Sequence, residues 1–149
     1  MPTIRSIVKN VMYEKYFIDS NVWLYLLLAD DENKYLTAKQ FINNCISYGK
    51  VIVSWQVINE VSANLLKNRF SENEIVTTVK WLLKIAEMQD FSEDILLFAS
   101  SLRKNHLFSF WDSLILSAAL KANCDYIVSE DMQHNQLLNR NLKIINPFL

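Results

Sequence analysis

The sequence predicts an α/β domain built around a mostly parallel β-sheet. Short apolar runs typical of buried strands alternate with longer segments whose apolar residues recur at helical spacing. The chain has 149 residues, of which 51% are hydrophobic and 21% charged, as in an ordinary globular domain. No low-complexity segment, repeat or Pro/Gly-rich break divides it. We therefore expect one domain over residues 1–149, in which residues 1–11 form an N-terminal extension of no assigned role.

Five apolar runs are expected to form the strands. They are Tyr16–Ile18, Lys50–Val53, Ile85–Gln89, Asp125–Val128 and Leu142–Ile145. The fourth run shows the clearest strand pattern and the third the weakest. Pro147 ends the fifth run, since proline cannot donate a hydrogen bond to a neighbouring strand. Because helical segments separate most of these runs, the strands should lie parallel to one another.

Six segments are expected to form helices between the strands. They are Ser20–Leu28, Lys34–Tyr48, Ser54–Asn68, Ser71–Lys84, Ser92–Asn105 and Phe110–Ala122, and a short turn or helix follows at Gln133–Leu138. Ser54, Ser71 and Ser92 stand at N-cap positions, and Ser71 forms a capping box with Glu74. Gly49 stands where a C-cap glycine would end the second helix.

The composition excludes several classes of function. The single glycine, Gly49, leaves no glycine-rich loop for a P-loop or a dinucleotide-binding fingerprint. Cys45 and Cys124 lack Cys or His partners at zinc-ligand spacing, so we interpret them as buried reduced thiols. No apolar run approaches the roughly 20 residues of a membrane span. The N-terminus lacks the apolar core of a signal peptide, so we expect a cytoplasmic protein.

The net charge of −1 does not by itself indicate a nucleic-acid partner. Basic residues nevertheless form four modest clusters. These are Lys67 with Arg69, Lys80 with Lys84, Arg103 with Lys104, and Arg140 with Lys143. Each cluster is by default a solvated face, and the alternative is a groove that binds phosphates.

Four acidic residues far apart in the sequence are candidates for one site. They are Asp19 in Phe-Ile-Asp-Ser-Asn, Glu60 in Ile-Asn-Glu-Val, Asp112 in Trp-Asp-Ser-Leu and Asp131 in Ser-Glu-Asp-Met. Open parallel sheets bind ligands at the carboxyl ends of their strands, where Asp19 and Asp131 stand. Clustered carboxylates repel one another unless a cation lies between them, and hard oxygen ligands select Mg²⁺ or Mn²⁺. The four acids therefore predict a metal-dependent site.

Two of these acids have a plain structural alternative. Asp19 could cap the next helix, but Ser20 and Asn21 could do so equally well, which leaves Asp19 free for a site. Glu60 falls beside Asn64 on what reads as the solvated face of its helix. Only the presence of the other three acidic residues supports a role for Glu60 in the metal site.

On the wheel of its own helix, Asp112 lies on the side that we expect to be buried. The polar stripe of that helix is Ser113, Ser117 and Lys121, and Asp112 lies roughly 140° from it, among apolar residues. A buried carboxylate is costly unless it is paired or binds a metal. The alternative is an acid of the first turn that is favoured by the helix dipole.

Asp131 competes with its neighbour Glu130, because the two side chains leave an extended chain in opposite directions. Only one of them should face a metal ion. Ser129 could hydrogen-bond a ligand carboxylate, and we count Asn21, Ser129 and Glu130 as supporting residues of the site.

The four tryptophans fall at core-like helical spacings. We interpret them as packing residues rather than as platforms for stacking bases. They are Trp23, Trp55, Trp81 and Trp111.

Taken in order, the four acidic motifs resemble the PIN-domain family, and within it the VapC-type toxins of prokaryotic toxin–antitoxin pairs. The resemblance covers about Lys15 to Phe148. It implies a three-layer α/β/α domain. A glycine that often follows the fourth acid in the family is replaced by Asn135, which tolerates the left-handed conformation of such a turn.

The resemblance implies an endoribonuclease that hydrolyses RNA phosphodiester bonds with Mg²⁺ or Mn²⁺. Asp19, Glu60, Asp112 and Asp131 would be its catalytic and metal-binding residues. It also implies a homodimer and a cognate antitoxin protein that silences the enzyme. Two alternatives stay open: a catalytically inactive PIN-fold module that acts by binding partners, and a housekeeping RNA-processing nuclease without an antitoxin.

Overall fold

A six-stranded sheet forms the centre of the computed structural model, which describes residues 13–149. Its strands are β1 (Lys15–Ile18), β2 (Lys50–Ser54), β3 (Glu87–Gln89), β4 (Tyr126–Val128), β5 (Leu137–Leu138) and β6 (Leu142–Ile145). They lie in the order β3-β2-β1-β4-β6-β5, and only β5 runs antiparallel to its neighbour. The predicted α/β class with a mostly parallel sheet is confirmed. The predicted extension at residues 1–11 lies outside the described part of the chain.

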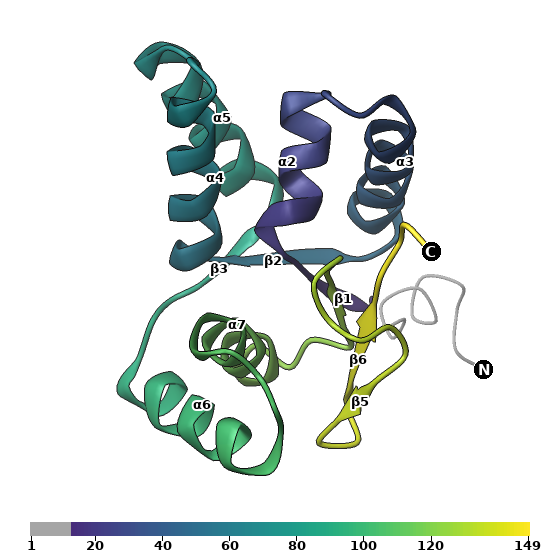
Figure 1. Cartoon of the computed structure of the whole chain (residues 1–149), viewed down its shortest axis with the longest axis vertical. Helices are drawn as coiled ribbons and strands as arrows, with labels where there is room; N and C mark the ends of the chain where they lie inside the picture. The colour runs from purple at the N-terminus through teal and green to yellow at the C-terminus, as the bar shows by residue number, and fades with distance from the viewer. Residues whose placement is uncertain (1–12) are drawn as a thin grey trace, which may run out of the picture.

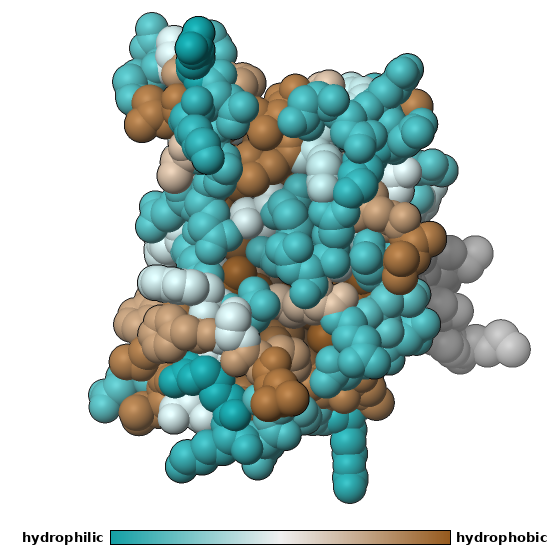
Figure 2. All heavy atoms as spheres, in the orientation of Figure 1, coloured by the Kyte–Doolittle hydropathy of each residue, from teal (hydrophilic) through white to brown (hydrophobic). Residues whose placement is uncertain are grey.

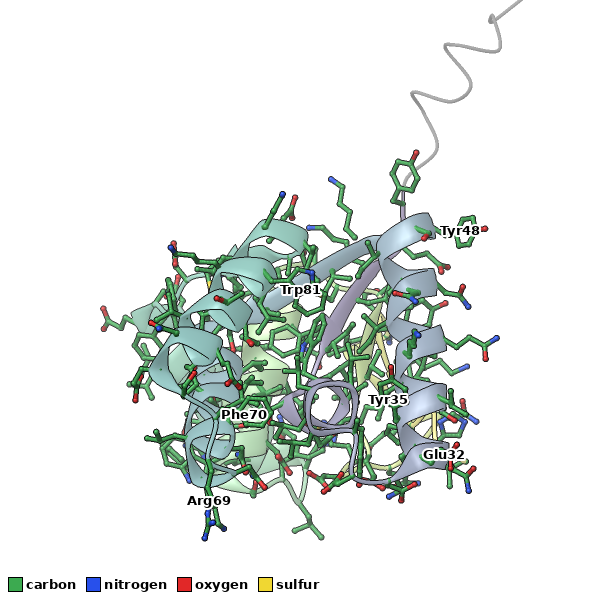
Figure 3. The ribbon with its side chains drawn as sticks, turned by 90° about the horizontal axis from the view of Figure 1, so that it is seen from above. Glu32, Tyr35, Tyr48, Arg69, Phe70 and Trp81 are labelled. Carbon is green, nitrogen blue, oxygen red and sulfur yellow. The ribbon has the colours of Figure 1, made fainter. Side chains whose placement is uncertain are left out.

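Helices cover both faces of the sheet, which gives three layers (Figure 1). One face carries α2 (Ser20–Leu28), α3 (Glu32–Tyr48), α4 (Trp55–Lys67) and α5 (Glu72–Ile85), and the other carries α6 (Glu93–Asn105) and α7 (Phe110–Lys121). Figure 3 looks down on the first of these layers, with α2 seen end-on between α3 and the α4–α5 pair. None of the helices described between residues 13 and 149 is long and apolar enough to cross a membrane.

The crossover connections change sides of the sheet between β1 and β4. The connections from β1 to β2 and from β2 to β3 pass over one face through α2–α5, whereas the connection from β3 to β4 passes over the other face through α6 and α7. The carboxyl ends of β1 and β4 therefore flank the point where strand order reverses. Ligands bind at this point in open α/β sheets.

The core fills the space between the sheet and both helical layers. Phe17 and Ile127 of the central strands are fully buried, as expected for parallel strands covered on both faces. Trp23 of α2 is also fully buried, and its ring meets that of Trp81 of α5 edge-on at a centroid distance of 5.9 Å. Cysteines 45 and 124 are buried free thiols, as predicted, and burial raises the pKa of both to about 12.

The segment expected as a short turn or helix at residues 133–138 forms turns and the short strand β5. Asn135 adopts a left-handed conformation with φ 67°, as its side chain allows. Asn139 and Arg140 also have positive φ, and they lie in the reversal that folds β5 back onto β6. A turn was therefore the right alternative and a helix the wrong one, because Asn135 is left-handed and Leu137 and Leu138 are extended in β5.

Gly49 is the C-cap of α3, as predicted, and its backbone N–H donates to the Cys45 carbonyl, but the cap is not left-handed. Its φ of −141° and ψ of −162° are extended and open to any residue. Glycine is needed here because the chain passes close by: a Cβ at this position would lie 2.7 Å from the Glu14 carbonyl oxygen and 2.9 Å from Cε2 of Tyr16.

Gly49→Ala is expected to lower the free energy of unfolding by about 1–3 kcal/mol, because the added methyl group would collide with the backbone that leads into β1. Asn44→Ala, on the exposed side of α3, should change stability by less than about 0.5 kcal/mol. Urea denaturation of both variants and the wild type measures the difference. A Gly49→Ala variant as stable as the wild type would show that the Glu14 carbonyl can move aside.

Candidate functional site at the carboxyl ends of β1 and β4

Asp19 follows β1 directly and is a buried acid with both oxygens engaged. Its side chain is only 4% exposed. Oδ1 accepts a hydrogen bond from the backbone N–H of Ser20 at 2.8 Å and caps α2, while Oδ2 accepts from Oγ of Ser129 at 2.8 Å and from Nδ2 of Asn21 at 3.4 Å. The expectation that Ser20 or Asn21 would replace Asp19 as the cap is wrong, because their side chains turn to the other acids.

Asn21 and Ser129 connect Asp19 to Asp131. Asn21 Nδ2 donates to Oδ2 of Asp131 at 3.0 Å and lies 3.2 Å from Oγ of Ser129. The backbone N–H of Asp131 also donates to Oγ of Ser129, at 3.2 Å. These two supporting residues thus hold carboxylates that follow two different strands.

Glu130 turns away from this cluster and ties its loop to α2 and α3. Its carboxylate accepts a hydrogen bond from the Tyr25 hydroxyl at 2.5 Å and forms an ion pair with Lys34. Burial acts to raise the pKa of Glu130, but the hydrogen bonds from Lys34 and Tyr25 outweigh it and lower the pKa below its usual value. Of the two competing acids, Asp131 is therefore the one beside Asp19.

The helical wheel places Glu60 on a solvated face, but the residue is half-buried because α4 lies beside α2. Oε2 of Glu60 accepts a hydrogen bond from the Ser20 hydroxyl at 2.5 Å. Oε1 accepts from Nε2 of Gln56 at 3.0 Å. Residues Ser20 and Gln56 thus position Glu60, and sequence reasoning missed both roles. The position of Gln56, one helical turn before Glu60, was the available signal.

The serines of the polar stripe predicted for α7 are buried, and so are Ile115, Leu116 and Ala119 on the side predicted to be apolar. Ser113 and Ser117 of the supposed polar stripe are fully buried, whereas Asp112 is half-buried. The Ser117 hydroxyl donates to the carbonyl of Ile95 at 2.7 Å, and Ser113 Oγ accepts from Arg103 Nη1 at 2.7 Å. The serines can face α6 because each hydroxyl finds a partner there. Asp112 instead stands in the first turn of the helix.

The electrostatic field at Asp19 comes partly from the other acids. Burial raises its pKa to about 6, and the negative charges of Glu60 and Asp112 add to the increase. The hydrogen bonds from Ser129 and Ser20 act in the opposite direction. The raised pKa means that the ionised form of Asp19 is disfavoured without a compensating positive charge.

Asp112 experiences the same crowding. Burial raises its pKa, a hydrogen bond with Ser109 opposes this, and the charges of Asp131 and Glu60 raise it further. The four acids from four chain segments thus act on one another. Among residues 13–149, no three Asp, Glu, His or Cys side chains lie close enough to hold one ion together in this arrangement. Both oxygens of Glu60 are engaged by neighbouring side chains.

A cavity of about 570 Å³ opens beside Glu60, and its wall includes Trp55 and Trp111. These two tryptophans are 44% and 63% exposed, so their interpretation as core residues is wrong. Trp23 is buried as predicted, and Trp81 is partly exposed where α5 faces α2. Trp111 adjoins Asp112 in the sequence, which was the signal that it lies at the site.

This chain belongs to the PIN domain family, whose model matches residues 16–137. No curated protein matches the sequence.

Among solved structures, the fold is similar to VapBC2 of Rickettsia felis bound to a promoter DNA fragment, with a TM-score of 0.65 and 18% identity over 89% of this chain and 99% of that one. A toxin–antitoxin complex of Klebsiella pneumoniae gives a TM-score of 0.65 and 16% identity over 89% and 97% of the two chains. VapC20 of Mycobacterium tuberculosis, a toxin that cleaves the sarcin–ricin loop, gives a TM-score of 0.60 and 19% identity over 75% and 86%. At these identities the likeness establishes a shared fold.

The free energy of unfolding is expected to fall as the pH rises from about 4 to about 6, because of Asp19. Its folded pKa of about 6 lies above its usual value of 3.8, so the folded state binds the proton more tightly in this window. The extra stability is fully present below about pH 4 and is lost by about pH 6, a difference of roughly 3 kcal/mol.

Urea denaturation across this range, in a chelating buffer, tests the expectation. Asp19→Asn should flatten the pH dependence, whereas Asp94→Asn, an exposed acid of α6, should keep it. Identical slopes for the wild type and Asp19→Asn would contradict a raised pKa at Asp19.

Proposed function

We propose that this chain is a metal-dependent endoribonuclease and the toxin of a type II toxin–antitoxin pair. One observation carries the proposal: Asp19, Glu60, Asp112 and Asp131 crowd one end of the sheet, where hydrogen bonds join Asp19 to Asp131 through Asn21 and the negative charges of the neighbouring acids raise the pKa of Asp19 and of Asp112. Such crowding destabilises the fold, and the binding of a cation would explain why these carboxylates lie together. Membership of the PIN domain family supports the same reading.

The donor chemistry of the four acids fits Mg²⁺ or Mn²⁺, because all their ligand atoms are hard carboxylate oxygens. Asp19, Glu60, Asp112 and Asp131 would hold the ion, directly or through water. When bound, a divalent ion would act as a Lewis acid toward the phosphodiester. It would also lower the pKa of a water molecule bound to it, so that hydroxide is available near neutral pH.

The remaining residues of the site orient these acids. Asn21 and Ser129 hold the carboxylates of Asp19 and Asp131 by hydrogen bonds. Glu130 fixes the loop that carries Asp131, through Tyr25 and Lys34. Since neighbouring side chains hold Asp19, Asp131 and Glu60, these carboxylates stay close together despite their repulsion.

The partners proposed for this chain follow from its relatives. VapC20 is a toxin that cleaves the sarcin–ricin loop, the Rickettsia structure is of VapBC2, and the Klebsiella structure is a toxin–antitoxin complex. For this chain we infer an RNA substrate, a cognate antitoxin protein, a homodimeric state and a cytoplasmic location.

Asp112→Asn is expected to lower the rate of Mg²⁺-dependent RNA cleavage more than about a hundredfold, because even the loss of an outer-shell group at a metal site costs roughly 10–100-fold. The matched control is Asp94→Asn, which alters an exposed first-turn acid of α6 and should cleave at the wild-type rate. Gel analysis of total cellular RNA measures both. Expression of the wild type alone should arrest growth, and expression of Asp112→Asn should not.

An Asp112→Asn variant that cleaves RNA and arrests growth like the wild type would overturn the catalytic assignment. Cleavage by the wild type without growth arrest would favour a housekeeping nuclease. A folded wild type that cleaves no RNA would favour the inactive binding module.

Millimolar Mn²⁺ is expected to raise the melting temperature of the wild type. Binding to the native state alone adds about 2.7 kcal/mol at a hundredfold excess over Kd, which corresponds to roughly 5–10 °C for a chain of this length. Asp19→Asn should show no such shift in thermal melts, and Asp94→Asn should show the full shift. Equal shifts in Asp19→Asn and the wild type would mean that the ion binds elsewhere.

A further inference from the structure

The cavity beside the acids presents aromatic surface to solvent. It lies between the first turn of α4, the segment after β3, and α7, and its volume of about 570 Å³ falls within the roughly 300–1,000 Å³ of small-molecule pockets. Trp55, Phe91 and Trp111 line it, and all three are exposed. Figure 2 shows apolar side chains gathered in the lower half of the view, where α6 and α7 lie. Aromatic rings kept in water at a concave site indicate a ligand.

The two indole rings of the cavity each contact a neighbouring side chain. Nε1 of Trp55 donates a hydrogen bond to Oδ1 of Asp90 at 3.0 Å. Trp111 meets Phe110 edge-on at a centroid distance of 5.1 Å and an interplanar angle of 89°. Exposed rings that are held by such contacts can stack on a ligand without first being ordered. Stacking on aromatic side chains suits any nucleobase, since every base has a π face.

The polar groups of the cavity suit the edge of a neutral base and not a phosphate. Gln56, Asn59 and Gln89 line it, and each amide can both donate and accept hydrogen bonds. Within the described chain, Glu60 is the only charged residue in the lining. A carboxylate without a lysine or arginine beside it repels phosphate, so phosphate is the wrong occupant.

The cavity is continuous with the cluster of acids. Nε2 of Gln56 donates to Glu60 at 3.0 Å and to the backbone carbonyl of Trp111 at 3.3 Å. Trp111 also precedes Asp112 directly in the sequence. A nucleotide strand with one phosphate at the acids would therefore bring a neighbouring base to the rim of the cavity.

We propose that this cavity seats one unpaired base of the RNA substrate, stacked on Trp111 and Trp55, beside the phosphodiester that is cut. The proposal rests on the ribonuclease function proposed above and narrows its substrate to RNA that is single-stranded at this position. A base within a duplex cannot enter the cavity, because both of its faces are covered by neighbouring pairs.

Binding of a fluorescently labelled single-stranded RNA, measured by anisotropy in a chelating buffer that prevents cleavage, tests the proposal. Trp111→Ala should weaken binding roughly 5- to 150-fold, and Trp111→Phe should recover most of the loss because it restores a ring. Tyr48→Ala removes an aromatic side chain that is 77% exposed at the far end of α3 and should bind like the wild type.

A series of RNAs with one abasic position each gives the sharper comparison. The wild type should bind one member of the series about as weakly as Trp111→Ala binds the intact RNA. Trp111→Ala should not distinguish that member from the intact strand, because the ring that the missing base would contact is already gone.

The possible outcomes distinguish a failure of the base-binding proposal, called the base seat below, from a failure of the ribonuclease proposal. If the wild type cleaves RNA with Mg²⁺ but Trp111→Ala binds equally well and no abasic position matters, the base seat is wrong and the nuclease stands. If the wild type neither binds nor cleaves RNA, both are wrong. If Trp111→Ala halves the mass in solution, measured by sedimentation, while RNA affinity is unchanged, the cavity is a contact between copies of the chain and the proposal is overturned.

Discussion

Strands β1 and β4 pair in parallel with Ile18 opposite Val128, and Asp19 continues the pairing by donating its backbone N–H to the Val128 carbonyl at 2.9 Å. Both strands are buried on both faces, so a slip of one residue would turn every side chain to the opposite helical layer. The register is therefore fixed by the core. It brings Asp19 to Ser129, and the hydrogen bonds of Asn21 and Asp131 depend on that placement.

Most of the strands, the helices and two of the four acids could be predicted because their signals are local. Apolar runs mark every described strand except β5, serine caps mark three helix starts, Asp19 follows β1 directly and Asp131 lies shortly after β4. The surroundings of Glu60 could not be predicted, because they depend on α2 lying beside α4. Each helical wheel describes one helix by itself and does not include the helix that packs against it.

The burial of the α7 serines has a related cause. A serine reads as polar in a sequence, yet Ser117 is fully buried because its hydroxyl reaches a carbonyl of α6. For the tryptophans, the prediction of burial was wrong in the opposite direction. Trp23 and Trp111 have equally apolar rings, but only Trp23 lies between the helices and the sheet, whereas Trp111 lines an open cavity. Hydropathy therefore gives the amount of apolar surface, and the tertiary arrangement decides which of it is covered.

The three hydrogen bonds that hold the Asp19 carboxylate also determine how this side chain can respond to a ligand. Ser20, Asn21 and Ser129 engage both of its oxygens, so it cannot rotate without breaking them. Its rotamer entropy is already lost when the chain folds, and an immobilised side chain of this kind otherwise costs roughly 0.5–1.5 kcal/mol on binding. Asp19 is thus preorganised, and the affinity for any ion at this end of the sheet is not reduced by the need to order it.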